Sequence, residues 1–142
     1  MSVDALEAGL GGAATHYTTA GLPAARRRAF WREALSNTFG SVDMKVPDEV
    51  EHGSIRASSV GSLQAVMVEG DPHRAQRTKR LIAGSVNDGF IVVKVLSQGA
   101  LRVQQDAREA CLSGGQMFVY DMARPVELVV PERFQTKSLA LP

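Results

Sequence analysis

Apolar and polar residues alternate along most of the chain after Ser41, which is the pattern of half-buried β-strands. A nearly continuous apolar run from Phe90 to Leu96 suits a strand inside the core. The other expected strands are centred on Val42-Met44-Val46, Ile55–Ala57, Leu63–Val68, Leu101–Val103, Ala110–Leu112, Met117–Tyr120, Val126–Val130 and Thr136–Leu141, with turns at Val60–Ser62, Asp71-Pro72, Ser97–Gly99, Gly114-Gly115 and Pro131-Glu132. Strands that recur about every 8 to 12 residues predict an all-β sandwich or barrel. The segment Thr78–Ala83 fits either a strand or a short helix.

A helical period precedes the strands. The residues that recur at three- and four-residue spacing are Phe30, Trp31, Ala34, Leu35 and Thr38. Pro23 suits the first position of a helix and Gly40 its C-cap, so we predict an amphipathic helix of about four turns. Residues 1–22 have no clear period and are rich in Gly, Ala and Thr, which predicts a flexible arm ahead of one domain over residues 23–142.

Composition narrows the class of protein. The chain has 142 residues, which suit one domain, and its formal net charge of +1 excludes a polybasic nucleic-acid arm or an acidic tail as the whole function. A hydrophobic content of 44% excludes a disordered chain. No apolar run is long enough for a membrane span and no secretory leader follows Met1, so a cytoplasmic protein is expected. Cys111 is the single cysteine, and we expect it to be a buried, inert thiol.

Residues that could carry catalysis or hold a metal are scattered. His16, His52 and His73 stand at no metal-ligand spacing to one another, so we interpret each as a surface or loop histidine. We predict no catalytic residue, no metal and no cofactor. Positive charge gathers at two places, and we interpret both as solvated faces, with a ligand anion or an acidic partner surface as the alternative. The two clusters are Arg26-Arg27-Arg28 and the group His73, Arg74, Arg77, Lys79 and Arg80.

A stretch late in the chain resembles a known family. It comprises Gln105-Asp106-Ala107-Arg108-Glu109-Ala110, Leu112, Gly115, Tyr120-Asp121, Arg124-Pro125 and Glu127-Leu128. In this order and spacing, these residues resemble the N-terminal sensor domain of AraC-type transcription regulators. The likeness extends back to Phe30–Leu35 and Asp71–Arg74 and forward to Leu139–Pro142, so that it covers most of the chain from Ala24 onward.

The resemblance implies a mainly β, cupin-like double-stranded β-helix (a jelly-roll barrel) with flanking helices, which holds a small effector. Alternate strand residues face into a barrel, so Val92, Lys94, Met117 and Val119 are candidates to line it, depending on the register of their strands. The candidate polar groups for binding the effector are Lys94, Arg102, Tyr120 and Arg124. Tyr120 could instead be a core phenol, and Arg124 could instead pair with Asp121 or Glu127.

The resemblance also implies a homodimer. Phe30 and Trp31 lie about 100° apart on the predicted helix, so one can face the barrel and the other a partner copy. We therefore take Phe30, Trp31 and Leu35 as candidate dimerisation residues. DNA would be contacted only through a helix-turn-helix domain beyond Pro142, and no membrane contact is expected.

The chain departs from the family pattern at three turn positions. Ala107 stands where a glycine is common, Gly114 where a proline is frequent and Gln116 where an aspartate is usual. The His and Glu set with which many cupin enzymes bind a metal is not found along Phe90 to Leu112, which argues against metal-dependent catalysis. We therefore predict the effector-sensing and dimerisation domain of a bacterial transcription regulator, which is not an enzyme. The alternatives are a cupin-type enzyme and a stand-alone cupin binding module.

Overall fold

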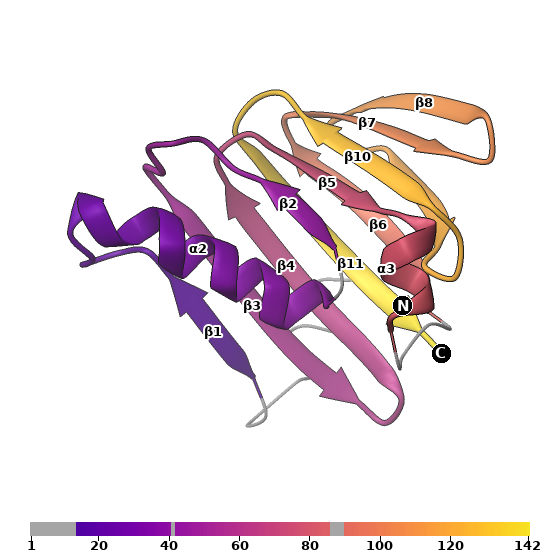
Figure 1. Ribbon diagram of the computed structural model, residues 1–142, viewed down its shortest axis with the longest axis horizontal. Helices are drawn as coiled ribbons and strands as arrows, with labels where there is room; N and C mark the ends of the chain where they lie inside the picture. Colours follow the sequence, from indigo (N-terminus) through magenta and orange to yellow (C-terminus); the bar gives the residue numbers. More distant parts are fainter. Residues whose placement is uncertain (1–13, 41, 86–89) are drawn as a thin grey trace.

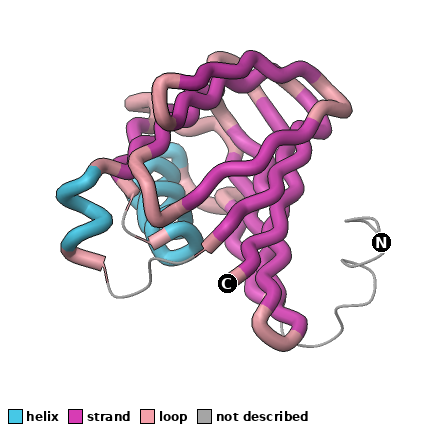
Figure 2. The backbone as a smooth tube through the Cα atoms, turned by 90° about the vertical axis from the view of Figure 1, so that its right-hand side faces the viewer, coloured by secondary structure: helices cyan, strands magenta, loops and turns pink. Residues whose placement is uncertain are grey.

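The computed structural model describes residues 14–40, 42–85 and 90–142, which are mostly strands with two helices, α2 (Ala24–Phe39) and α3 (Lys79–Ala83). In chain order the strands are β1 (Thr15–Thr18), β2 (Asp43–Lys45), β3 (Gly53–Val60), β4 (Leu63–Gly70), β5 (His73–Arg77), β6 (Ile91–Gln98), β7 (Ala100–Gln105), β8 (Arg108–Ser113), β9 (Met117–Asp121), β10 (Val126–Val130) and β11 (Phe134–Leu141). They form a six-stranded sheet, β1-β3-β4-β11-β6-β9, and a five-stranded sheet, β2-β5-β10-β7-β8 (Figure 1). Figure 2 shows both helices on one side of the strands.

The mainly β fold confirms the expectation from the alternating pattern, as do the positions of the strands other than β1 and β5, which were not predicted. Strand β11 lies between β4 and β6 and pairs antiparallel with both, so the last strand of the chain is central to the larger sheet. The inner faces of the two sheets supply the core, and Ile55 and Leu96 are among its fully buried side chains. The open question at Thr78–Ala83 is settled as the short helix α3, where the Thr78 hydroxyl caps the Leu81 N–H at 3.2 Å.

Helix α2 confirms the predicted helix, and Trp31 anchors it to the larger sheet. The indole is fully buried over Gly53 and Gly70, which face each other across the β3–β4 pair. A Cβ atom added to Gly53 would lie 2.5 Å from the indole, so only glycine leaves room for the ring. Ala34 and Leu35 are buried on the same side of the helix. The expectation that Trp31 and Leu35 contact a partner copy is therefore wrong, because both side chains are buried inside this chain.

A flexible arm was expected over residues 1–22, and this expectation is wrong for the part that the structure describes. Residues 1–13 lie outside the described residues. Thr15–Thr18 forms β1, which pairs antiparallel with β3. Beyond it the buried Thr19 exchanges hydrogen bonds with Gly53: its N–H donates to the Gly53 carbonyl at 2.9 Å, and its hydroxyl accepts from the Gly53 N–H at 3.0 Å. Tyr17 packs edge-on against the half-buried Phe30, with ring centroids 6.4 Å apart. These contacts tie the segment to the sheet and to α2.

Strand β9 has the opposite facing from the one expected. Its pairing with β6 places Phe118 opposite Lys94 and Tyr120 opposite Val92, and these two rings turn toward the core. Met117 and Val119, which were candidates to line the barrel, are 65% and 59% exposed. All residues of this segment are apolar or aromatic up to Tyr120, so alternation alone could not choose the inner face. Cys111 is also corrected, because it is exposed on the edge strand β8.

The tight turn between β7 and β8 consists of Asp106 and Ala107. Both residues have left-handed backbone conformations, with φ angles of 52° and 61°. Two successive positive φ values are the signature of a two-residue type I′ hairpin turn, which favours Asn-Gly or Asp-Gly. Ala107 therefore holds a strained backbone conformation.

Candidate functional site

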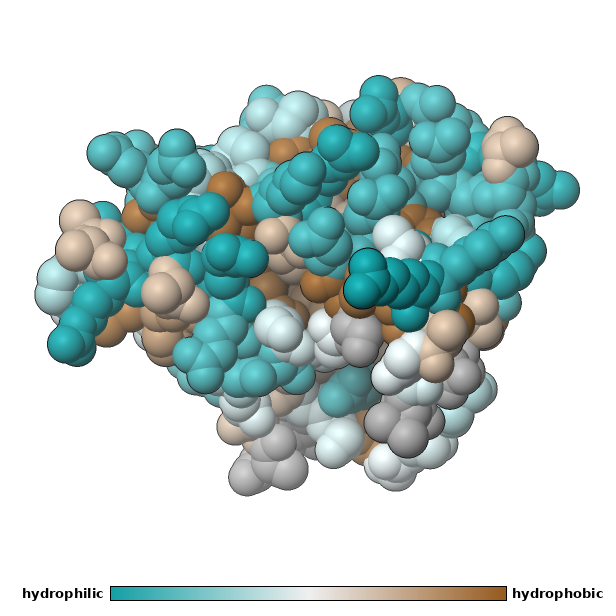
Figure 3. All heavy atoms as spheres, in the orientation of Figure 1, coloured by the Kyte–Doolittle hydropathy of each residue, from teal (hydrophilic) through white to brown (hydrophobic). Residues whose placement is uncertain are grey.

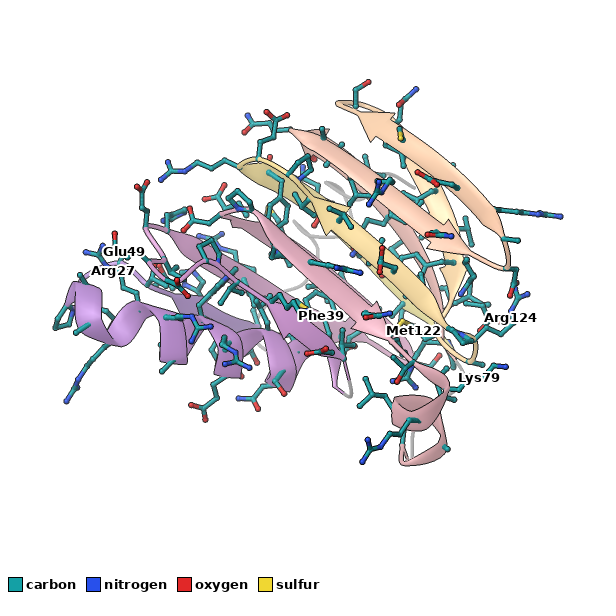
Figure 4. All side chains as sticks on the ribbon, turned by 45° about the horizontal axis from the view of Figure 1, so that its top comes forward. Arg27, Phe39, Glu49, Lys79, Met122 and Arg124 are labelled. Atoms are coloured by element: carbon teal, nitrogen blue, oxygen red, sulfur yellow. The ribbon has the colours of Figure 1, made fainter. Side chains whose placement is uncertain are left out.

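A cavity lies between the two sheets and provides the candidate binding site. The volume in this cavity that the centre of a water molecule can occupy is about 40 Å³. Figure 3 shows apolar atoms in a recess between α2 and β2. In Figure 4, Phe39 at the end of α2 and Met122 after β9 lie toward the middle of the molecule. The lining is Phe39, Val42, Met44, Val68, His73, Ala75, Arg77, Lys94, Leu101, Tyr120, Met122, Val126, Leu128, Val130, Phe134 and Thr136.

Lys94 is a charged residue on the inner face of β6. It is 7% exposed, and its Nζ lies 5.5 Å from the ring centroids of both Phe39 and Tyr120, within cation–π range. Lys94 makes no ion pair or hydrogen bond with any described residue. Two of the candidate ligand residues, Lys94 and Tyr120, thus meet at the cavity wall.

His73 enters the cavity from the other sheet, at the start of β5. Burial, together with the positive charge of Lys94, lowers the pKa of His73 to about 4, so the ring is neutral at pH 7. Phe134 packs edge-on against it, with ring centroids 4.9 Å apart, and Nδ1 is buried with no partner among the described residues. The expectation of a surface or loop histidine is therefore wrong for His73.

The basic cluster around β5 divides between the two faces of the strand. Every second residue of β5 faces the cavity, namely His73, Ala75 and Arg77. The two-residue period of a strand could have predicted this common face. The buried Arg77 donates from Nε to the Met122 carbonyl at 2.6 Å and so ties β5 to the segment after β9. Arg74 points outward and pairs with Glu127 at 2.6 Å. The cluster is therefore not a single solvated face.

Arg102 and Arg124, the remaining candidate ligand residues, lie outside the cavity. The Arg124 side chain is 53% exposed and pairs with Asp106 and, at 3.4 Å, with Asp121. Figure 4 shows it at the edge of the molecule, away from Phe39. Arg102 is exposed and its Nε lies 3.7 Å from Glu109. The ion pair with Asp121, which the sequence left open for Arg124, is thus present. Neither arginine lines the cavity that contains Lys94, whereas Arg124 and Tyr120 both line a second pocket beside Glu109 and Phe118.

Several residues that line the cavity were not predicted from the sequence. Phe39 and Met122 were not singled out, because one ends a helix and the other stands in a turn, where no strand period applies.

Within residues 14–40, 42–85 and 90–142, no three His, Cys, Asp or Glu side chains are placed to hold a metal ion. No helix among these residues is long and apolar enough to cross a membrane.

Comparison with known proteins places the chain in a family. The family model of the AraC-binding-like domain matches residues 31–142. An uncharacterised protein encoded in a nit 5′ region of Bacillus sp. (strain OxB-1) is 32% identical over 110 residues, which are 77% of this chain and 42% of that protein. This chain therefore spans less than half the length of that curated relative.

Solved structures show the same fold. The AraC-like transcriptional activator CuxR superposes with a TM-score of 0.75 at 18% identity, covering 92% of this chain and 47% of that one. A cupin superfamily protein from Desulfitobacterium hafniense DCB-2 superposes with a TM-score of 0.50 at 12% identity, covering 68% of this chain and 81% of that one. The two sheets are thus a cupin-like jelly roll, and the family match favours a regulatory role over a catalytic one. The chain belongs to the AraC-binding-like domain family.

Proposed function

We propose that this chain is the effector-sensing domain of an AraC-type transcription regulator. In this proposal a small molecule binds between the sheets, and its binding controls an attached DNA-binding domain. The observation that carries the proposal is the cavity itself, which is mostly apolar and has a few buried polar groups from both sheets. That combination is typical of small-molecule sites, in which apolar walls provide affinity and placed polar groups provide orientation.

The route from the cavity to the rest of the molecule would run through α2. Phe39 is the last residue of that helix and contacts the Lys94 ammonium. A ligand that engages Lys94 changes the surroundings of Phe39, and so favours one position of the helix end over another. Homodimerisation, a cytoplasmic location and DNA contact through another domain are further parts of the proposal. Phe30 remains a candidate dimerisation residue on α2, since it is only half-buried.

A cavity-filling variant tests the proposal. Ala75 lines the cavity, whereas Ala110 is exposed on β8, so Ala75→Leu and Ala110→Leu make the same change inside and outside the site. A library of small metabolites is screened by thermal shift against the native chain and both variants. We expect at least one compound to raise the Tm of the native chain and of Ala110→Leu but not of Ala75→Leu. Equal stabilisation of both variants would place binding elsewhere and contradict the proposal.

A further inference from the structure

Lys94 occupies a position at which the strand pattern calls for an apolar residue. Its neighbours on the inner face of β6 are Val92 and Leu96, both buried. Its ammonium group lies near two aromatic rings and has no anionic partner among the residues that the structure describes. Buried charges in proteins are normally paired, because removing an ion from water is unfavourable. An ammonium that lines a cavity without such a partner therefore suggests that its counter-ion is a ligand bound there.

The rest of the cavity has the same electrostatic character. No acidic side chain lines it among the described residues, and His73 and Arg77 are its other titratable basic groups. Nδ1 of His73, which lines the cavity, is buried without a partner in the described part of the chain. Ser138 lies directly opposite Lys94 in the β11–β6 pair, and its buried Oγ has no partner among the described residues. The site thus combines two buried cations, Lys94 and Arg77, with unused hydrogen-bonding capacity on His73.

The geometry points to a small monocarboxylate as the effector, with its carboxylate on Lys94 and its carbon body against the apolar walls. This inference rests on the proposed function and specifies its ligand. The oxygens of a carboxylate can accept charge-assisted hydrogen bonds from the Lys94 ammonium, which carries three donors.

The size of the cavity selects among anions. Its open space of about 40 Å³ is a few times the roughly 10–15 Å³ that a cavity needs to hold one water, so a small ligand is favoured. Larger bodies require Met44, Met122 or Phe39 to move, and methionine side chains adapt readily. A phosphate group, which proteins usually surround with several cationic or backbone donors, is poorly matched here, because Arg77, the other cation of the lining, donates to the Met122 carbonyl.

Matched acids and amides test the inference on the native chain. The probes are sodium acetate, propanoate, butanoate and benzoate, each compared by calorimetry and thermal shift with its neutral amide and with sodium chloride. We expect at least one acid to bind about 10-fold or more tightly than its amide, because a charge-assisted hydrogen bond to Lys94 is lost in the amide. Chloride should not reproduce the effect.

Two lysine variants locate the recognition. Lys94→Met keeps the length of the side chain and removes the charge, and we expect it to abolish the preference for the acid, an effect of about 10- to 100-fold. Lys45→Met makes the same change on the exposed face of β2 and should leave the preference intact. If Lys94→Met does not fold, the acid–amide comparison on the native chain and on Lys94→Arg still decides the matter.

The outcomes separate this inference from the broader function. Equal binding of acids and amides, no binding by any acid in the series, or a preference that survives in Lys94→Met would overturn the carboxylate. A neutral compound whose binding is blocked by Ala75→Leu would also overturn it, yet would support the sensing function. The proposed function fails separately, if binding compounds stabilise Ala75→Leu as well as the native chain.

Discussion

Lys94 and His73 face each other from different sheets, and each is energetically unfavourable where it stands. A buried ammonium without an anionic partner lowers stability, and cation–π contacts of about 0.5–2 kcal/mol offset only part of that loss. His73 is kept neutral by the same surroundings. Residues that break the local pattern in this way are expected at binding sites, since the compensation comes from the ligand.

Replacing Lys94 tests whether it serves the fold or the ligand. We expect Lys94→Met to raise the free energy of unfolding of the ligand-free chain by about 1–2 kcal/mol, because it removes a buried charge and keeps the packing volume. Urea denaturation of the native chain, Lys94→Met and the exposed control Lys45→Met provides the measurement. A clear loss of stability in Lys94→Met would instead assign the lysine a structural role through its two aromatic contacts.

His73 should make stability depend on pH. Its pKa of about 4 in the folded chain lies below the value of about 6.5 expected when unfolded, so between these values the unfolded chain binds a proton that the folded chain does not. Lowering the pH from 7 to 5 therefore favours unfolding, by roughly 2 kcal/mol from this residue. This destabilisation is absent above a pH of about 6.5, grows as the pH falls, and reaches its full size below a pH of about 4.

Denaturation curves at the two pH values measure this effect. In His73→Gln the difference between pH 7 and pH 5 should shrink by roughly 2 kcal/mol, since the titrating group is gone. His16 is exposed, so His16→Gln is the matched control and should keep the native pH dependence. A His73→Gln variant with an unchanged pH dependence would show that another group titrates.

Helix α2 is positioned by the fit of one side chain against the sheet, whereas β8 is positioned mainly by the turn that joins it to β7. The paired glycines Gly53 and Gly70 form a flat surface that accepts Trp31, so the helix has one seat on the sheet. The β7–β8 hairpin instead projects with β8 at a sheet edge, where only Leu112 is buried. Its pairing therefore depends on the two-residue turn at Asp106 and Ala107 more than on packing.

That turn can be improved by one substitution. Left-handed backbone is unfavourable for alanine by about 1–2 kcal/mol, and glycine removes this strain while losing some entropy on folding. We expect Ala107→Gly to raise the free energy of unfolding by about 0.5–1 kcal/mol. Ala110→Gly, within β8, should lower it by a similar amount. Thermal or urea denaturation distinguishes the two, and a destabilising Ala107→Gly would mean that the turn is not strained.

For the whole molecule, the cavity links parts that are distant in the chain. Its walls come from the end of α2, from β5 and β10 of one sheet, and from β6, β9 and β11 of the other. A ligand held there contacts both layers, so it stabilises the sandwich as a unit, by about 2.7 kcal/mol when its concentration is 100-fold above Kd.

Hydrogen exchange can show this coupling. With a compound that stabilises the native chain, we expect slower amide exchange in the last turn of α2, around Lys94 in β6 and around Tyr120 in β9, because Phe39 and Tyr120 flank the ammonium. The β3–β4 turn at Gly61 is remote from the cavity lining and serves as the internal reference. Protection that is equal at the turn and in α2, or absent from α2, would contradict the proposed route through Phe39.

Local features of this protein followed from its sequence. Period two predicted the strands, Pro23 and Gly40 bounded the helix, and the resemblance over the later strands predicted the family and the jelly roll. These features depend on contacts between residues close in the chain, or on the order of such segments, which the sequence displays directly.

The tertiary structure alone decided which faces meet. Strand β9 is apolar on both sides, so only its register with β6 turned Tyr120 inward and Met117 outward. The helical pattern allowed Trp31 to face either the sheet or a partner copy. The paired glycines, which leave room for its ring, fix it against the sheet. Lys94 and His73 belong to different sheets, and no local pattern joins them. Their meeting in one cavity is a property of non-local packing, because the distance between two such side chains depends on how all the intervening strands pair.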